Sequence, residues 1–208
     1  MSTNLLYIAD PMCSWCWGFS PVIDAVRDHY GERLPVHLLM GGLRPGTSEP
    51  MDGSAKAELK GHWEHVQKAT GRPFDYTFFE REGFVYDTEP ASRAVVAVRR
   101  LEPELALDFL KRVQEAFYAM NCDVTDPGML ADIAVETGLK RRIFASEFVA
   151  EEAINETRKS FEITRRLGIT GFPTLLIGSE NGGIESITTG YRPWVQVKER
   201  IENYEINV

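Results

Sequence analysis

Residues Cys13-Ser14-Trp15-Cys16 place two cysteines three positions apart near the start of the chain. A thiolate is the reactive form in disulfide exchange, and it is favoured where unpaired N–H groups open a helix. A second thiol one helical turn away can attack the mixed disulfide formed on the first and release the substrate. The spacing therefore indicates thiol-disulfide exchange, in which Cys16 resolves what Cys13 has captured.

Two other interpretations of the pair remain open. The cysteines can be structural, or they can be half of a zinc site. Zinc sites in proteins usually have four ligands. The remaining candidates are Cys122 and four histidines at scattered spacings: His29, His37, His62 and His65. We expect no metal site.

A second motif, Gly168-Ile-Thr-Gly-Phe-Pro-Thr174, stands far along the chain, directly before an apolar run. Proline is accepted as the first residue of a strand, and the Phe172-Pro173 bond can be cis at modest cost. A cis bond would turn residues 170–172 outward toward Cys13. This backbone would then offer an edge with which a substrate peptide can pair.

The surrounding pattern predicts elements that position both motifs. A short apolar run at residues 5–9 indicates a buried strand, and the stripe that follows Cys13 indicates a helix. Ser20-Pro21 falls inside this stripe, so we expect the helix to kink or restart there with Ser20 as its cap. A second strand is expected at residues 36–40.

Residues 50 to 167 are expected to be almost wholly helical, with breakers between the helices. Strands follow at residues 174–178 and 184–189, joined by a turn at Asn181-Gly182, and a closing helix begins at Pro193-Trp194. This order predicts an α/β protein with a large all-helical insertion between the second and third strands. We place the insertion at residues 45–165 and the α/β domain at residues 1–44 and 166–208.

Composition narrows the function classes. The chain has 208 residues, 43% of them hydrophobic, and a formal net charge of -8. Nucleic-acid surfaces are usually basic, and a membrane helix needs about 20 apolar residues, so we expect neither partner. The first residues lack the features of a secretion signal, and three cysteines are too few for a disulfide framework. These features favour a cytoplasmic location.

The two motifs together resemble the thioredoxin superfamily. The similarity is to the DsbA-like thiol-disulfide oxidoreductases and their predicted cytosolic disulfide-isomerase branch. It is carried by Asp10-Pro-Met-Cys-Ser-Trp-Cys-Trp-Gly18, by Pro21, by the helical insertion and by Thr170-Gly-Phe-Pro-Thr174. It implies a thioredoxin-like fold in which Cys13 attacks, Cys16 resolves and Pro173 is a cis-proline opposite them.

The resemblance also indicates the class of substrate, and it leaves alternative functions to be considered. We expect Ser14, Trp15, Thr170, Gly171 and Phe172 to contact protein or small-molecule disulfides and thiols. No bound cofactor is expected, and glutathione or another thiol system would recycle the pair. Ser14-Trp15 replaces the Pro-His of strongly oxidising periplasmic members, so we expect a weaker oxidant. The rival functions are a kappa-type glutathione transferase or isomerase and a non-catalytic binding or holdase module.

Three further residues near the pair have open roles. Asp10 is either a helix-start acceptor or a proton relay for Cys16. We expect Trp15 to be exposed, whereas Trp17 can pack beneath the helix. Cys122 is either an incidental apolar residue or a regulatory thiol.

Overall fold

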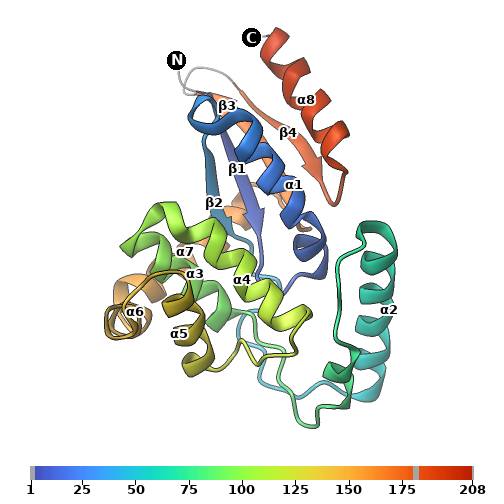
Figure 1. Ribbon diagram of the computed structural model, residues 1–208, viewed down its shortest axis with the longest axis vertical. Coiled ribbons are helices and arrows are strands. Elements are labelled where there is room, and N and C mark those ends of the chain that lie inside the picture. The colour runs from blue at the N-terminus through green and yellow to red at the C-terminus, as the bar shows by residue number, and fades with distance from the viewer. Residues whose placement is uncertain (1–2, 180–182, 208) are drawn as a thin grey trace.

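The computed structural model describes residues 3–179 and 183–207, which build a four-stranded sheet with helices around it (Figure 1). The strands are β1 (Thr3–Ala9), β2 (Val36–Met40), β3 (Thr174–Ser179) and β4 (Ile184–Thr189), in the order β2-β1-β3-β4. β1 pairs in parallel with β2, whereas the β1–β3 and β3–β4 pairs are antiparallel. β1 is therefore an inner strand. The cysteine motif follows β1 and the Gly-Phe-Pro motif precedes β3, so the two motifs lie next to strands that are neighbours in the sheet.

The side chains of β1 alternate between the two faces of the sheet, and both faces are covered by other parts of the chain. Leu5, Tyr7 and Ala9 join the large core on one face, and Ile8 joins a small cluster with Leu39 and Leu176 on the other. A strand covered on both sides reads as a continuous apolar run, and residues 5–9 have this pattern.

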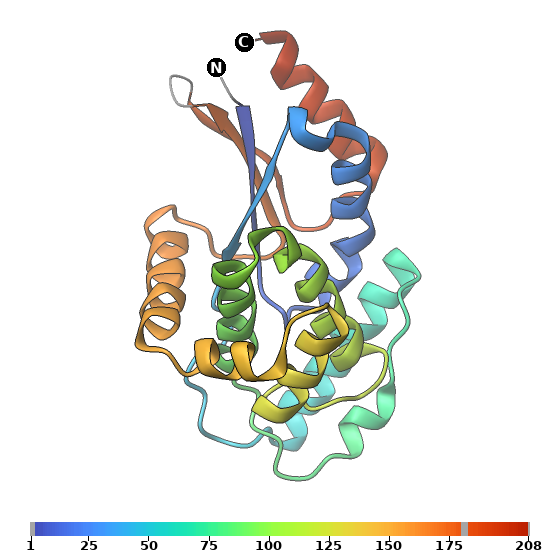
Figure 2. The ribbon, with the colours of Figure 1, turned by 60° about the vertical axis from the view of Figure 1, so that its left-hand side comes forward.

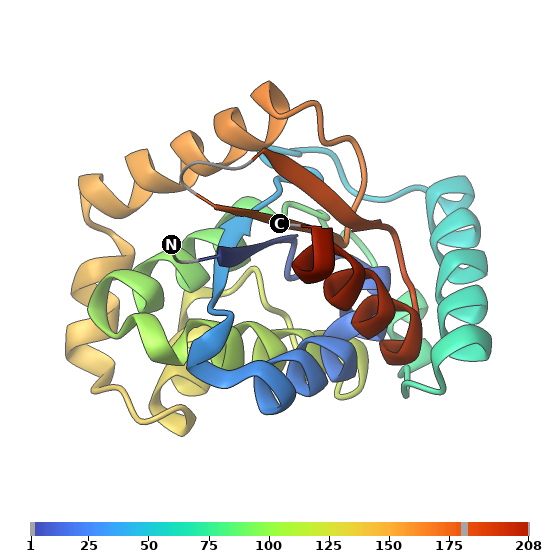
Figure 3. The same ribbon diagram turned by 90° about the horizontal axis from the view of Figure 1, so that it is seen from above.

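The helices α1 (Ser14–Tyr30) and α8 (Trp194–Asn207) lie on one side of the sheet, and α7 (Glu151–Arg166) lies on the other (Figure 3). The expected restart of α1 at Ser20-Pro21 is wrong, because one helix runs through both residues. Pro21 has no N–H to offer the carbonyl of Trp17. The Ser20 hydroxyl donates to that carbonyl at 2.9 Å instead of capping a second helix.

The chain between β2 and β3 is the expected helical insertion, seen below the sheet in Figures 1 and 2. Its helices before α7 are α2 (Gly53–Thr70), α3 (Glu89–Leu101), α4 (Ala106–Tyr118), α5 (Pro127–Glu136) and α6 (Arg141–Phe148). One hydrophobic cluster includes residues from α1, α3, α4 and the sheet. The insertion thus shares the core of the α/β part, and its division at residues 45 and 165 stays a prediction.

Most sequence-predicted elements coincide with the structure. The strands at 36–40 and 184–189 have the expected bounds, and the helices after Thr88 and Asp126 start where expected. The predicted turn at Asn181-Gly182 lies outside the described residues. Across 3–179 and 183–207, each helix is too short or too polar to span a bilayer.

Candidate active site

Cys13 and Cys16 lie at the end of β1 where α1 begins. Cys13 is the N-cap residue of α1, with an extended backbone (φ -97°, ψ 115°), and its N–H donates to the carbonyl of Asp10 at 3.1 Å. The Cys13 side chain is 7% exposed and Cys16 is fully buried. All three cysteines of the chain are unbridged thiols. Both cysteines are therefore buried, and of the pair only Cys13 keeps a small exposed fraction.

The second motif meets the first at this point. The Phe172-Pro173 peptide bond is cis, as the sequence motif led us to expect. The sulfur of Cys13 lies 3.6 Å from the carbonyl oxygen of Phe172. Pro173 is buried directly before β3, and its carbonyl accepts the N–H of Gly190 at 2.7 Å. β1 and β3 are neighbours in the sheet, which explains how residues so distant in sequence come together.

The sequence-predicted contact residues lie around Cys13 with different exposures. Thr170 and Gly171 are exposed, Phe172 is half-buried and Ser14 is buried. Trp15 is half-buried rather than exposed, because its ring packs on Tyr191 with centroids 5.9 Å apart. The expectation of an exposed Trp15 is therefore corrected, because the side chain also packs against the large core.

Asp10 is fully buried between the cysteines and the loop after β2. Its carboxylate accepts the N–H of Met12 at 2.9 Å and the N–H of Leu43 at 2.8 Å, and the Thr88 hydroxyl also donates to it. Burial raises the pKa of Asp10 to about 6 despite these three donors. The carboxylate thus accepts from the turn before α1 rather than from the helix itself, and α1 begins without a side-chain cap. It also ties the cysteine loop to the loop after β2 and to Thr88.

Cys16 is held in its protonated form. Burial is the largest cause that raises its pKa, followed by the hydrogen bond and the charge interaction with Cys13. The Asp10 carboxylate adds a smaller effect in the same direction, whereas the Asp10 backbone N–H lowers the pKa. The environments of the two sulfurs therefore differ: Cys16 is enclosed and favours the thiol, and Cys13 stands at the helix N-terminus.

Residues of the insertion form hydrogen bonds with the cysteine loop and the start of α1. The hydroxyl of Tyr86 donates to the carbonyl of Met12 at 2.6 Å and lies 3.4 Å from the Tyr118 hydroxyl. Trp17, whose place was left open, is fully buried, and its indole N–H donates to the carbonyl of Pro73 at 3.0 Å. The sequence analysis did not identify Tyr86 or Thr88. Their only local signal is that they directly precede the predicted helix start at Glu89-Pro90, which does not indicate a contact with the cysteine loop.

α2 of the insertion approaches the cysteine helix closely at Gly18. A Cβ added there would lie 2.8 Å from a methyl group of Thr70 and 3.0 Å from one of Val66. The glycine that follows Trp17 is therefore a packing requirement between α1 and α2.

Metal chemistry finds no support in the described part of the chain. Within residues 3–179 and 183–207, no three His, Cys, Asp or Glu side chains cluster as metal ligands would. Cys122 is half-buried in the insertion, with its sulfur 3.8 Å from the carbonyl of Met120. Its role as an incidental residue or a regulatory thiol stays open.

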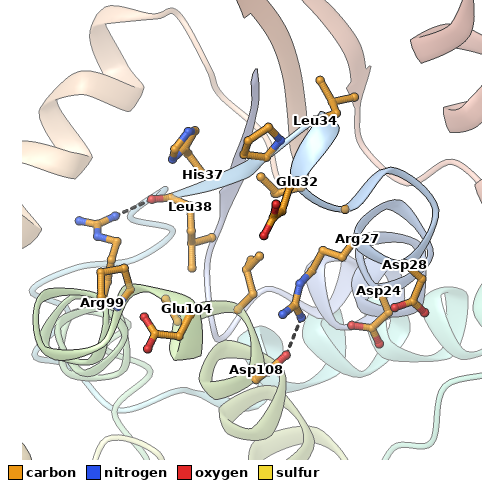
Figure 4. Close-up of a pocket in the computed structure, with 16 residues that line it drawn as sticks. Asp24, Arg27, Asp28, Glu32, Leu34, His37, Leu38, Arg99, Glu104 and Asp108 are labelled. Atoms are coloured by element: carbon orange, nitrogen blue, oxygen red, sulfur yellow. Dashed lines mark hydrogen bonds and ion pairs between the residues drawn. The ribbon is translucent and has the colours of Figure 1, made fainter. Parts of the chain in front are cut away.

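A groove of about 880 Å³ lies at the other end of α1, between that helix, β2 and α4 (Figure 4). Its arginines already have partners: Arg27 pairs with Asp108 at 2.5 Å, and Arg99 donates to the carbonyl of Leu38. Neither cysteine lines it.

Comparisons with known proteins agree with this geometry. A solved structure described as a "putative protein disulfide isomerase" from Nitrosomonas europaea is 39% identical, has a TM-score of 0.94 and covers 100% of this chain and 99% of its own. The cytosolic disulfide reductase DsbM from Pseudomonas aeruginosa, solved with GSH, is 26% identical with a TM-score of 0.79, covering 99% and 100%.

A curated relative, the ClpXP adapter protein SpxH of Halalkalibacterium halodurans, is 22% identical over 198 residues. The alignment covers 91% of this chain but 64% of the relative, so the chain spans less than two thirds of that protein's length. Residues 6–202 match the family described as DSBA-like thioredoxin domain. The fold is that of DsbA-like thiol-disulfide oxidoreductases, and the chain belongs to the DSBA-like thioredoxin domain family.

Proposed function

We propose that this protein is a dithiol-disulfide oxidoreductase of the reductase or isomerase type that works through Cys13 and Cys16. The observation that carries the proposal is the asymmetry of the pair: Cys13 keeps a small exposed fraction and lies beside the Phe172 carbonyl, whereas Cys16 is fully enclosed. An exchange enzyme needs one sulfur that substrates can reach and a second that reacts only with the first.

The mechanism has two steps in which atoms and electrons balance. The Cys13 thiolate attacks a substrate disulfide, so a mixed disulfide forms and one substrate thiolate leaves. Cys16 then loses its proton and attacks the Cys13 sulfur, which releases the second substrate thiolate and leaves a Cys13–Cys16 disulfide. Two thiols, such as two glutathione molecules, reduce this disulfide and become oxidised themselves.

The exposed backbone of Thr170 and Gly171 gives the substrate a place to lie beside Cys13. Both residues are exposed and directly precede Phe172, whose carbonyl faces the Cys13 sulfur. The Gly171 carbonyl accepts the Thr174 hydroxyl at 2.9 Å, and an extended substrate segment can pair with the exposed backbone that precedes it. Pro173 has no N–H to offer at the end of this edge, and the proposal has Ser14 and Trp15 contact the substrate from the start of α1.

The preferred direction is reduction or isomerisation, with glutathione or another thiol system as the recycling reductant. The structural relative DsbM is named a cytosolic disulfide reductase and was solved with GSH. A neutral tryptophan at position 15 supplies no positive charge to the helix N-terminus. The proposed site of action is the cytoplasm, whose thiol pool would keep the pair reduced.

Turnover of a model protein disulfide with glutathione as reductant tests the proposal. Cys13→Ser should lower the rate about a thousandfold or more, because the nucleophile is gone. Cys122→Ser is the matched control and should keep full activity. Turnover by Cys13→Ser at the wild-type rate would contradict the oxidoreductase proposal.

A non-catalytic adapter is the second candidate, because four curated relatives are named ClpXP adapter proteins. An adapter predicts that Cys13→Ser still binds its client with wild-type affinity, which a pull-down of the intact chain measures. A kappa-type glutathione enzyme is the third, and it predicts that a Cys16→Ala variant captures glutathione alone from cytosol. Capture of client proteins as mixed disulfides favours the oxidoreductase.

A further inference from the structure

The groove at the end of α1 remote from the cysteines borders the outer edge of the sheet. Its volume is about 880 Å³, and it lies between α1, β2 and α4 (Figure 4). β2 is an edge strand, because the order in the sheet is β2-β1-β3-β4. Neither the cysteine pair nor the Phe172-Pro173 motif lines this groove, so it has no part in the exchange reaction described above.

The register of β1 and β2 determines which backbone groups face the groove. Leu5 of β1 pairs with Val36, and its N–H donates to the carbonyl of Pro35 at 2.8 Å. The backbone groups of successive residues point to opposite sides of a strand, so alternate residues of β2 bond to β1. The remaining residues therefore turn their N–H and C=O groups outward: Val36, Leu38 and Met40.

Side chains protect only part of this outer edge. Arg99 donates to the carbonyl of Leu38, and the Thr164 hydroxyl donates to the carbonyl of Met40 at 3.2 Å. Within residues 3–179 and 183–207, no group binds the outward N–H and C=O of Val36 or the N–H of Leu38. Covering an edge is a usual way to prevent pairing with another chain. Here the cover ends at Leu38, and a short stretch of the edge is open to the groove.

The side chains around this open stretch make the groove acidic. Each arginine that lines it has an acidic partner: Arg27 pairs with Asp108, and Arg99 pairs with Glu156. Three further carboxylates of the lining are exposed and form no ion pair with another described residue: Asp28, Glu32 and Glu104. Figure 4 shows Glu32 pointing into the groove. The groove thus offers negative charge that the chain itself does not neutralise.

The floor of the groove is apolar. Leu34 and Leu38 are buried in the large core, and Val36 and Leu107 pack against it. An extended chain directs its side chains alternately to two faces, so a residue that pairs with the edge can place a small apolar side chain on this floor.

We propose that the groove binds an extended basic segment of another protein, which adds a strand to the edge of β2. One residue of the segment can exchange two hydrogen bonds with Val36, and the N–H of Leu38 offers a third. Lysines or arginines on both sides of that residue would meet the unpaired carboxylates of the groove. This partner surface goes beyond the proposed function, because it is remote from the cysteines and needs no redox step.

A second copy of this chain is a poorer occupant of the groove. The chain has a formal net charge of -8. Pairing of two β2 edges would bring Glu32 and Glu104 of both copies into one interface, and like charges across an interface oppose association. A basic segment gains from the same carboxylates.

Calorimetric titration of the intact, reduced protein tests the proposal. The probe is an acetylated and amidated peptide of five residues, with a central valine and two arginines on each side. It should bind once per chain and more weakly as salt is raised. A fully N-methylated version keeps the charges but has no backbone donors, and it should bind about tenfold more weakly. A version with glutamates in place of the arginines should not bind.

Variants of the protein locate the site. Glu32→Gln and Glu104→Gln should each weaken binding about threefold, and the two changes to arginine together should weaken it about tenfold or more. Glu64→Gln removes an exposed carboxylate of α2 that does not line the groove, and it should keep the wild-type affinity. Cys13→Ser should also bind the peptide normally.

Absence of binding, equal affinity for the N-methylated peptide or an affinity that the groove variants leave unchanged would overturn the proposal. A solution dimer that the peptide dissociates would identify a second copy as the occupant and would overturn it as well. Disulfide turnover by Glu104→Gln should equal that of wild type. Failure of the groove proposal therefore leaves the proposed function intact, and loss of turnover in the wild-type protein would leave the groove proposal intact.

Discussion

The two halves of the candidate site are built in opposite ways. The cysteine half, from Asp10 to Gly18, is enclosed and tied by hydrogen bonds to Leu43, Tyr86, Thr88 and Pro73. The proline half exposes Thr170 and Gly171, and hydrogen bonds hold it where β3 begins: the Gly171 carbonyl accepts the Thr174 hydroxyl, and the Pro173 carbonyl accepts the Gly190 N–H. The half that carries the redox chemistry is thus the half that the insertion supports.

This difference assigns separate tasks to the two halves. A buried, fully bonded loop holds the two sulfurs and their charges in one geometry, which sets the chemistry of exchange. An exposed backbone segment can accept varied substrates, because main-chain pairing does not depend on sequence. We expect changes in the cysteine half to alter stability and the chemical step, and changes near the open surface to alter substrate affinity.

The largest effect is expected from Asp10→Asn. In the folded protein Asp10 holds its proton up to about pH 6, whereas in the unfolded chain it loses it near 3.8. The stability that the protonated form contributes is therefore present below about pH 4 and is lost as pH rises to 6, about 3 kcal/mol in all. Asparagine removes this dependence.

Urea unfolding at about pH 4 and pH 7 measures this effect. Relative to wild type, Asp10→Asn should gain about 3 kcal/mol on going from the lower to the higher pH. If the difference in unfolding free energy between Asp10→Asn and wild type is the same at both pH values, the result would contradict the claim that burial destabilises the charged Asp10 carboxylate.

Gly41→Ala should force the two halves apart. A Cβ at Gly41, just after β2, would stand 2.3 Å from the ring of Phe172, so the ring must move. The displacement should cost about 1 to 3 kcal/mol and lower kcat/KM about tenfold, because the Phe172 carbonyl leaves Cys13. Denaturation and turnover measure both effects.

Gly61→Ala is the matched control for Gly41→Ala. Gly61 lies in α2, and an added Cβ there meets open space. Alanine should keep full activity and stabilise the helix by up to about 1 kcal/mol. Wild-type kcat/KM in Gly41→Ala would show that the position of Phe172 does not matter.

A smaller effect is expected from Tyr86→Phe, which tests the hydrogen bond between the insertion and the cysteine loop. It removes the hydroxyl that donates to Met12 at 2.6 Å and should cost about 1 kcal/mol. The rate of mixed-disulfide formation should fall a few-fold, whereas Tyr76→Phe, whose hydroxyl contacts Gln67, should change neither quantity by as much. Stopped-flow mixing gives the rate. If Tyr86→Phe is as stable as wild type, the result would contradict the claim that the insertion stabilises the cysteine half of the site.

The smallest effect is expected from Trp15→Ala, at the open border of the site. The half-buried ring on Tyr191 contributes little to stability, so unfolding should change by less than about 1 kcal/mol. KM for a folded protein disulfide should rise a few-fold with kcat nearly constant. Trp194→Ala, a half-buried tryptophan on α8, is the control, and a fall in kcat alone would contradict a binding role.

The sequence predicts the parts of the fold with local signals. Val36–Met40 is bounded by Pro35 and Gly41, and Asp126-Pro127 caps a helix, so both have the expected limits. The CxxC pair and the Phe172-Pro173 motif are recognisable because each has a fixed place in the fold, and the structure brings them within 3.6 Å.

What the sequence does not predict depends on contacts between distant residues. Tyr86 reaches Met12 across 74 positions, and no local pattern indicates this bond. The course of α1 through Pro21 depends on one hydroxyl, that of Ser20, which takes the place of the missing N–H. The half-burial of Trp15 depends on Tyr191, which only the packing of the finished sheet places there.

The most direct measurement is the site of modification in a Cys16→Ala variant exposed to glutathione disulfide. Peptide mapping by mass spectrometry gives the occupancy of each remaining cysteine. If Cys13 is the attacking nucleophile of an exchange pair, it should carry a stable adduct while Cys122 stays unmodified. An adduct mainly on Cys122, or none on Cys13, would contradict the account.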